Sequence, residues 1–159
     1  MGVQISYDLV GAGWAKCTIR VDDASATVTA SYLSAALDDL ASAVSATLRG
    51  HPHASASFTE EPGEYRWVFE PLPEGQVSVR ILEFKEMWGG RPDDEGEVIF
   101  SARCRLRTLA GALVSELQRL ERAYGHAGYR EKWVEYDFPV ARLDGLPQLL
   151  QDSPAPNVS

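Results

Sequence analysis

The sequence predicts an α+β protein, a two-layer sandwich in which one antiparallel sheet of about seven strands carries two helices on one face. Two observations favour this class. Runs of alternating apolar and polar residues, the period of a half-buried strand, follow one another with only short turns between them. Helical spacing of apolar residues occurs in two segments, whereas a parallel doubly wound sheet needs a helix after nearly every strand. The expected order is βββαββββα, followed by a C-terminal arm.

Three strands open the chain. Residues 3–9, 14–22 and 24–30 each alternate between apolar and polar side chains, and glycines or aspartates form the short connections. Consecutive strands with tight turns form an antiparallel meander. We therefore expect these three strands to be neighbours in the sheet.

The first helix follows this meander. Five apolar residues recur at intervals of three or four positions and so form one stripe of a helix, which ends at Gly50 and Pro52. The other side of the helix is rich in Ala and Ser, and we expect another element to cover part of it. The stripe consists of Leu33, Leu37, Leu40, Val44 and Leu48.

Four more strands come next, and Pro and Gly residues mark the turns between the first three of them. Apolar side chains occur at both Ile81 and Leu82, so the pattern predicts a bulge or burial on both faces at this point. The four strands are expected at residues 54–60, 65–70, 77–84 and 98–106.

The second helix is expected at residues 109–124, because its leucines have helical spacing and Gly125 is a typical helix end. Beyond it, the aromatic-rich stretch 128–139 is expected to form a short helical turn and an extended arm. We assign residues 1–150 to a single α+β domain and residues 151–159, which contain two prolines and few apolar residues, to a disordered tail.

Composition excludes several classes of function. A chain of 159 residues with 45% hydrophobic residues is long enough for one core. It has no run of 18 apolar residues and no apolar signal segment, so we expect a cytoplasmic protein that does not enter a membrane. Its formal net charge of −8 argues against binding of nucleic acid.

The charge is unevenly distributed along the chain. Residues 60–97 contain eleven acidic and four basic residues, a net charge of −7, whereas residues 98–132 carry a net charge of +4. Much of the acidic excess falls in predicted turns, which lie at protein surfaces. We therefore expect an acidic, loop-rich edge that attracts a basic protein partner.

No motif for catalysis or metal binding is present. The pair His51 and His53 lacks the further ligands that a structural metal site needs. Cys17 and Cys104 lie among apolar neighbours of two strands and are interpreted as buried, inert thiols. We expect no cofactor and no metal, and the sequence favours a protein that is not an enzyme without deciding that question.

The stretch 85–97, Lys-Glu-Met-Trp-Gly-Gly-Arg-Pro-Asp-Asp-Glu-Gly-Glu, joins the sixth and seventh strands and is longer than a hairpin loop requires. Its tryptophan either folds back on the core or is exposed as a binding residue surrounded by charge. The candidates for contact with a partner are Trp88, Arg91, Asp93, Asp94 and Glu95.

Two further groups of residues are candidates for a site. Three arginines at alternate positions of the last strand share one sheet face, where they either bind an anion or pair with glutamates of neighbouring strands. Four aromatic residues are candidates for the lining of a pocket between the sheet and the arm. The arginines are Arg103, Arg105 and Arg107, and the aromatic residues are Trp67, Tyr129, Trp133 and Tyr136.

Four parts of the chain together resemble uncharacterised single-domain bacterial proteins. They are the turn Glu61-Pro-Gly-Glu-Tyr-Arg-Trp67, the apolar strand 77–84, the helix 109–124, and Gly128-Tyr129 to Trp133 with Phe138-Pro139. Some small acidic α+β proteins of that kind are immunity proteins of toxin systems. The resemblance implies no catalytic residues.

Three hypotheses about function follow. The first is a non-enzymatic protein-binding domain of the immunity type, which neutralises a basic partner through its acidic edge. The second is a homo-oligomeric accessory or structural protein, such as a homodimer formed through the Ala/Ser helix face or an edge strand. The third is a small-ligand binder or enzyme with the aromatic-lined pocket.

Overall fold

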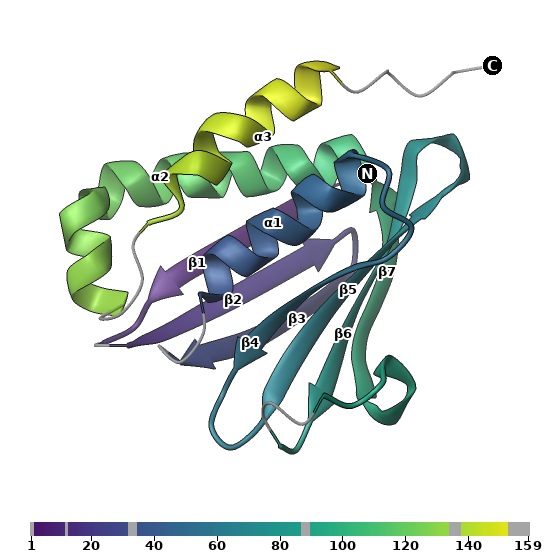
Figure 1. Cartoon of the computed structure of the whole chain (residues 1–159), viewed down its shortest axis with the longest axis horizontal. Coiled ribbons are helices and arrows are strands. Elements are labelled where there is room, and N and C mark those ends of the chain that lie inside the picture. The colour runs from purple at the N-terminus through teal and green to yellow at the C-terminus, as the bar shows by residue number, and fades with distance from the viewer. Residues whose placement is uncertain (1, 12, 32–34, 87–89, 134–137, 153–159) are drawn as a thin grey trace.

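The computed structural model describes residues 2–11, 13–31, 35–86, 90–133 and 138–152. In this part of the chain, seven strands and three α-helices follow one another as shown in Figure 1. The α+β class and the order βββαββββα are confirmed. The elements are β1 (Val3–Leu9), β2 (Trp14–Val21), β3 (Ala24–Ser31), α1 (Ala36–Leu48), β4 (Ala54–Thr59), β5 (Glu64–Leu72), β6 (Gln76–Phe84), β7 (Glu97–Arg105), α2 (Leu106–Trp133) and α3 (Val140–Asp152), with short 3-10 turns η1 (Pro73–Gly75) and η2 (Asp93–Glu95).

The seven strands form two antiparallel sheets, which corrects the expectation of one continuous sheet. The first has the order β1-β2-β3 and the second the order β4-β5-β6-β7. Between β3 and β4 the chain passes through α1, and side chains connect these two strands instead of a backbone ladder. The Thr29 hydroxyl donates to Glu60 Oε1 at 3.2 Å, and Ser31 Oγ lies 3.2 Å from Thr59 Oγ1.

One hydrophobic core joins the two sheets to α1 and α2. The inner faces of the sheets contribute residues such as Ile19 and Ile81, and the helices contribute the leucines of their apolar stripes. Aromatic rings fill the middle: Tyr7 meets Phe58 edge to face with ring centres 6.5 Å apart, and Phe58 packs against Trp67 at 5.4 Å. Both helices therefore close the same core.

The third helix, α3, was not expected and covers the Ala/Ser side of α1. Arg142 of α3 forms an ion pair with Asp38 of α1, with Nε and Oδ1 3.2 Å apart, and Leu146 is fully buried. Gly145 and Pro147 both have low helix propensity and conceal this helix in the sequence. The expectation that another element covers the back of α1 is thus confirmed, and this side of α1 is not free for homodimer formation.

Helix α2 bends sharply at Gly125, where the backbone leaves the helical region with φ of +65°. The predicted helix end is correct for the first segment, but a second helical segment continues to Trp133 and forms the elbow seen in Figure 1. The Gly13 N–H donates to the Lys132 carbonyl at 2.6 Å and ties this elbow to the β1–β2 turn. A glycine is suited to this bend because it adopts positive φ without strain.

Candidate functional site

The loop between β6 and β7 lies at one end of the four-stranded sheet. Strand β6 ends at Phe84 and β7 begins at Glu97, with η2 between them. Trp88 falls in residues 87–89, outside the described residues, so the choice between a buried and an exposed indole stays open. The described part of the loop begins again at Gly90, whose φ of +60° is a conformation that glycine adopts without strain.

Arg66 of β5 anchors this loop to the outer face of the sheet. Its Nη1 donates to the carbonyl oxygen of Arg91 at 2.6 Å and to Asp93 Oδ1 at 2.9 Å, and its Nε donates to Glu64 Oε2 at 3.3 Å. The Arg66 side chain is only 13% exposed. Arginine is suited to this position because its planar fork of donors reaches several oxygens at once.

Asp93 receives a second contact, from His53, whose Nε2 lies 2.8 Å from Asp93 Oδ2. Burial by itself would raise the pKa of this carboxyl, but hydrogen bonds from Arg66 and His53 outweigh burial and hold the pKa below its usual range. Asp93 is therefore an ionised anchor of the loop, and its role as a candidate for contact with a partner stays a prediction.

The anchored loop covers a small apolar cluster on the outer face of the sheet, which consists of Val68, Leu82 and Phe84. The Arg66 guanidinium lies 4.3 Å above the centre of the Phe84 ring. Gly96 brings the loop so close that an added Cβ would lie 2.7 Å from Phe84 Cζ and 2.9 Å from Leu82 Cβ. The length of the loop thus has a structural cause: it folds back to bury a second, minor core.

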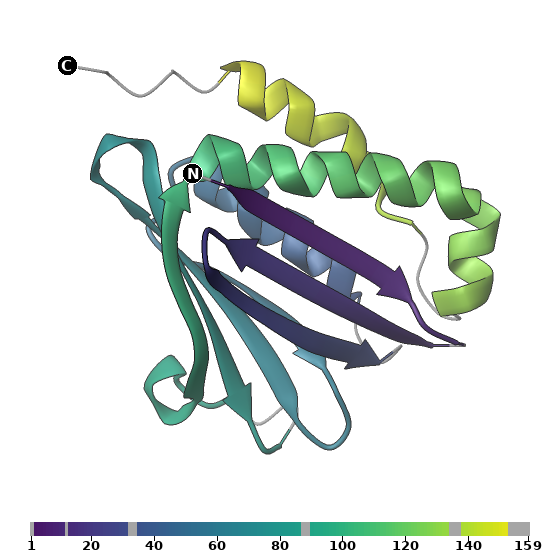
Figure 2. The same cartoon turned by 180° about the vertical axis from the view of Figure 1, so that it is seen from behind.

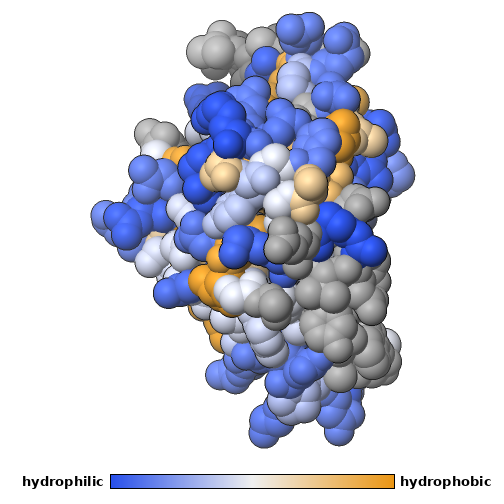
Figure 3. Space-filling model, turned by 90° about the vertical axis from the view of Figure 1, so that its left-hand side faces the viewer, coloured by the Kyte–Doolittle hydropathy of each residue, from blue (hydrophilic) through white to orange (hydrophobic). Residues whose placement is uncertain are grey.

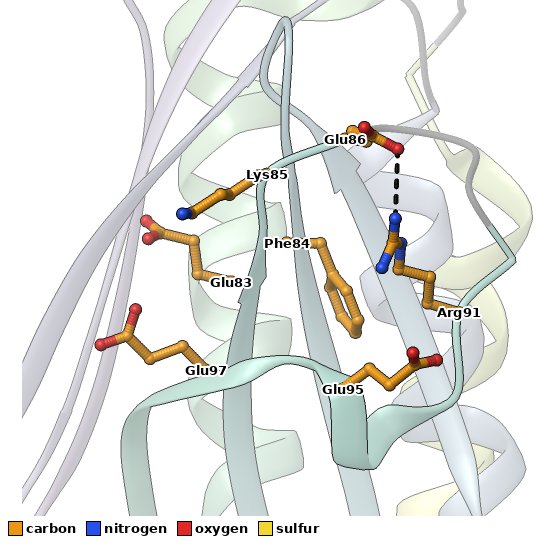
Figure 4. A pocket seen from close by; sticks show the side chains of 7 residues that line it. All are labelled: Glu83, Phe84, Lys85, Glu86, Arg91, Glu95 and Glu97. Carbon is orange, nitrogen blue, oxygen red and sulfur yellow. Dashed lines mark hydrogen bonds and ion pairs between the residues drawn. The ribbon is translucent and has the colours of Figure 1, made fainter.

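Beside this cluster lies an acidic cavity of about 270 Å³. Figure 4 shows the Phe84 ring in its middle, with Glu83 and Glu97 on one side and Arg91 and Glu95 on the other. Arg91 is paired with Glu86, with 3.4 Å between Nη2 and Oε2. Four carboxylates and two cations line the cavity, which is formed by Glu83, Phe84, Lys85, Glu86, Arg91, Glu95 and Glu97.

Glu83 and Glu97 lie directly opposite each other on β6 and β7. Like charges in this cross-strand arrangement repel each other and reduce stability. Burial, together with the nearby carboxylates of Glu60 and Glu83, also raises the pKa of Tyr65 on β5. The inner side of this sheet end therefore has an unusually high density of negative charge.

An apolar edge adjoins the acidic cavity. The register of β6 and β7 shifts between Ile81 and Leu82, which confirms the predicted bulge. Ile81 pairs with Phe100 and Leu82 with Val98, so Ile99 is the additional residue. Val98 is 52% exposed and Ile99 38% exposed. An apolar strip next to carboxylates has the composition of a protein-binding surface.

The remaining loop candidates divide into two groups. Arg91 and Glu95 line the cavity, and Asp94 is exposed on η2, so all three are accessible to a partner. Two contributors to the site, Glu83 and Glu97, were missed because they belong to strands. A register for β6 and β7 counted outward from the loop places Glu83 opposite Glu97.

The three arginines do not form one row. Arg103 and Arg105 are exposed on β7 opposite Ser78 and Gln76, so the expected pairing with glutamates directly across the strands is absent at these two positions. The strand ends at Arg105, and Arg107 lies in α2, where it donates to the Leu150 carbonyl of α3 at 2.6 Å. Arg107 therefore holds two helices together and does not extend the row.

The aromatic pocket candidates lie in the core. Trp67, Tyr129 and Trp133 are almost completely buried, and none of them lines the acidic cavity or two further surface cavities of the described part of the chain. Tyr136 falls outside the described residues. The two cysteines are buried and not bonded to each other, and burial raises the pKa of Cys104 to about 11. Among the described residues, no group of three His, Cys, Asp or Glu side chains is arranged to hold a metal.

The fold and this sheet end define an α+β protein with two antiparallel sheets and an acidic, partly apolar surface. None of the helices in the described ranges is long and apolar enough to cross a membrane. The side shown in Figure 3 is mainly hydrophilic, and its apolar patches are small and separated.

No family model matches the chain, and no curated protein matches it. One solved structure that the chain matches is a chain of the CdiA-CT/CdiI toxin and immunity complex from Enterobacter cloacae, with a TM-score of 0.48. The two chains are 15% identical, and the match covers 74% of this chain and 98% of the other. A similarity at this level assigns no function to the chain.

Proposed function

We propose that the protein is a non-enzymatic binding protein that holds a basic partner protein at the acidic end of its four-stranded sheet. One observation carries this proposal: four of the seven residues that line the cavity are glutamates, and the exposed apolar residues Val98 and Ile99 follow directly on β7. A lysine or arginine side chain of the partner suits this end of the sheet, because it places its charge among the carboxylates and its methylene groups against the exposed side chains of Val98 and Ile99.

The opposed pair Glu83 and Glu97 makes this end of the sheet receptive to a cation. A cation between two carboxylates relieves their repulsion and adds an attraction of about 1 to 4 kcal/mol at 4 Å, depending on solvent screening. The acidic surface also steers a basic partner during its approach, and this contribution weakens as salt concentration rises. Within this function, we assign the protein an immunity-type role, in which it blocks a harmful basic protein.

The test is affinity capture with wild type and two variants of equal charge change. Glu83→Gln/Glu97→Gln removes the opposed pair, whereas Asp23→Asn/Glu74→Gln removes two exposed charges from distant turns. Wild type and the control variant should retain the same basic protein, and the site variant should bind it at least tenfold more weakly, as measured by calorimetry with the identified partner. Equal binding by the two variants, or capture of an acidic protein alone, would contradict the proposal.

The immunity-type role has a separate test. The captured partner, expressed by itself in a host cell, should arrest growth, and co-expression of this protein should restore it. The Glu83→Gln/Glu97→Gln variant should restore growth less well at equal expression. A partner that is harmless when expressed alone would remove the immunity role but leave the binding function intact.

A further inference from the structure

Strand β1 is an edge of the three-stranded sheet, and α2 runs alongside it (Figure 2). At one position two side chains of α2 take the place of a neighbouring strand. The Tyr7 N–H donates to Glu116 Oε2 at 2.6 Å, and Arg119 Nη2 donates to the Tyr7 carbonyl at 2.9 Å. Arg119 Nε also donates to Glu116 Oε1 at 2.7 Å, which holds the two side chains together. At Tyr7 the edge is therefore closed.

One step further along β1 the same edge is open. In an antiparallel strand every second residue directs both its N–H and its C=O to the same side, so Ile5 presents these groups in the same direction as Tyr7. The residues of α2 beside this position are Ala112 and Ser115, whose side chains are short. Within the described ranges, no residue forms a hydrogen bond with the outward N–H or C=O of Ile5.

A groove of about 460 Å³ lies between this open edge and α2. Val3 and Ile5 of β1 form one wall, and Ala112 and Ser115 are part of the other. Unpaired backbone groups of an edge strand beside a groove, such as those of Ile5, are the groups to which an extended peptide adds as a further strand. The groove is on the opposite sheet from the acidic cavity, so a segment bound there leaves that cavity accessible.

The charge of the groove favours an acidic segment. Glu116 is neutralised by Arg119, which also contacts Asp8 at 3.3 Å. Arg122 lines the groove as well, and among the described residues no carboxylate forms an ion pair with it. The guanidinium of Arg122 is thus the remaining charge for a bound segment, and a carboxylate is its natural partner.

We propose that the groove between β1 and α2 binds an extended, carboxylate-bearing segment of a partner protein, which adds to β1 as a strand at Val3 to Ile5. Backbone hydrogen bonds to Ile5 supply the alignment, and Arg122 selects the negative charge. This surface is separate from the acidic cavity, and the inference does not depend on the function proposed for that cavity.

The probe is a fluorescein-labelled octapeptide of alternating Glu and Val, whose binding is measured by fluorescence anisotropy. Ser115→Phe fills the groove from an exposed helix position, and Gln118→Phe places the same ring on α2 at another exposed position as a control. We expect the peptide to bind wild type and Gln118→Phe equally, to lose binding to Ser115→Phe, and to bind Arg122→Gln threefold to tenfold more weakly. A Lys and Val octapeptide should not bind.

A second peptide distinguishes strand addition from ion pairing alone. N-methylation of alternate residues removes the backbone donors but leaves the carboxylates, so this peptide should bind at least tenfold more weakly. Equal binding of the methylated peptide, unchanged binding to Ser115→Phe, or no binding of the Glu and Val peptide would overturn the proposal. Peptide-free dimerisation that is lost in Ser115→Phe, measured by sedimentation, would also overturn it, because the occupant would then be a second copy of this chain.

Discussion

Replacement of Arg66 by alanine should release the β6–β7 loop and destabilise the protein. The change removes the ion pair with Asp93 at 2.9 Å, the hydrogen bond to the Arg91 carbonyl at 2.6 Å and the contact with the Phe84 ring. It also leaves Glu64 without its cation, although the Ser57 hydroxyl still donates to Glu64 at 2.8 Å. Loss of one member of a buried ion pair costs about 3 to 5 kcal/mol.

The expected cost for Arg66→Ala is lower, about 2 to 3 kcal/mol, because Asp93 keeps its contact with His53 and is partly hydrated. Urea unfolding followed by circular dichroism measures it. With a urea dependence of about 2 kcal/mol per molar, the midpoint should fall by about 1 to 1.5 M.

Arg80→Ala is the matched control for this measurement. Arg80 lies on the same outer face, is 30% exposed and pairs with a more exposed carboxylate, Glu70, at 2.9 Å. Its replacement should cost less than about 1 kcal/mol. Equal shifts of the urea midpoint in the two variants would refute the conclusion that Arg66 anchors the loop.

Three further predictions concern charge, packing and thiols. Burial, with the nearby charge of Asp38, raises the pKa of Asp39 to about 6. The folded protein therefore loses stability as pH rises from about 4 through 6, because Asp39 then ionises in a place that disfavours its charge. Asp39→Asn should raise the free energy of unfolding by about 1 kcal/mol at pH 7 and leave it unchanged at pH 4. Urea unfolding at both pH values measures this, and a gain of equal size at pH 4 would contradict it. Gly96→Ala should lower the free energy of unfolding by about 1 to 3 kcal/mol, because the added Cβ collides with the Phe84 ring. Gly111→Ala, in a helix with open space around it, should raise the free energy of unfolding by up to about 1 kcal/mol. Thermal unfolding followed by circular dichroism measures both changes. Both cysteines should resist a thiol reagent at pH 8 in the folded protein and react in urea, and rapid labelling of the folded state would show that the thiols are accessible.

Local periodicity was sufficient to predict the strands and the two core helices. The alternation in residues 3–9 matches β1 without a shift, and the two apolar neighbours Ile81 and Leu82 revealed the bulge. Both features depend on side-chain spacing within one segment, which any single strand or helix displays. The fold class therefore followed from the sequence.

Features that depend on distant partners could not be predicted in this way. Nothing local to β3 or β4 shows that Ser31 meets Thr59 through side chains and that the sheets separate there. The acids of residues 85–97 were predicted as a contact surface, but whether Asp93 faces a partner or Arg66 depends on how the loop returns over β5. Helix α3 is stabilised by its packing on both α1 and α2, which outweighs the low helix propensity of Gly145 and Pro147.

The opposed carboxylates of Glu83 and Glu97 have a consequence for how occupancy can be observed. Their repulsion lowers the free energy of unfolding of the unbound protein. A bound cationic group removes this repulsion, so binding raises the free energy of unfolding by more than the attraction to the cation alone. The melting temperature of wild type should therefore increase more on binding than that of the Glu83→Gln/Glu97→Gln variant, whose unbound form already lacks the repulsion. A simple thermal shift measurement would thus report whether this end of the sheet is occupied, even before the partner is identified.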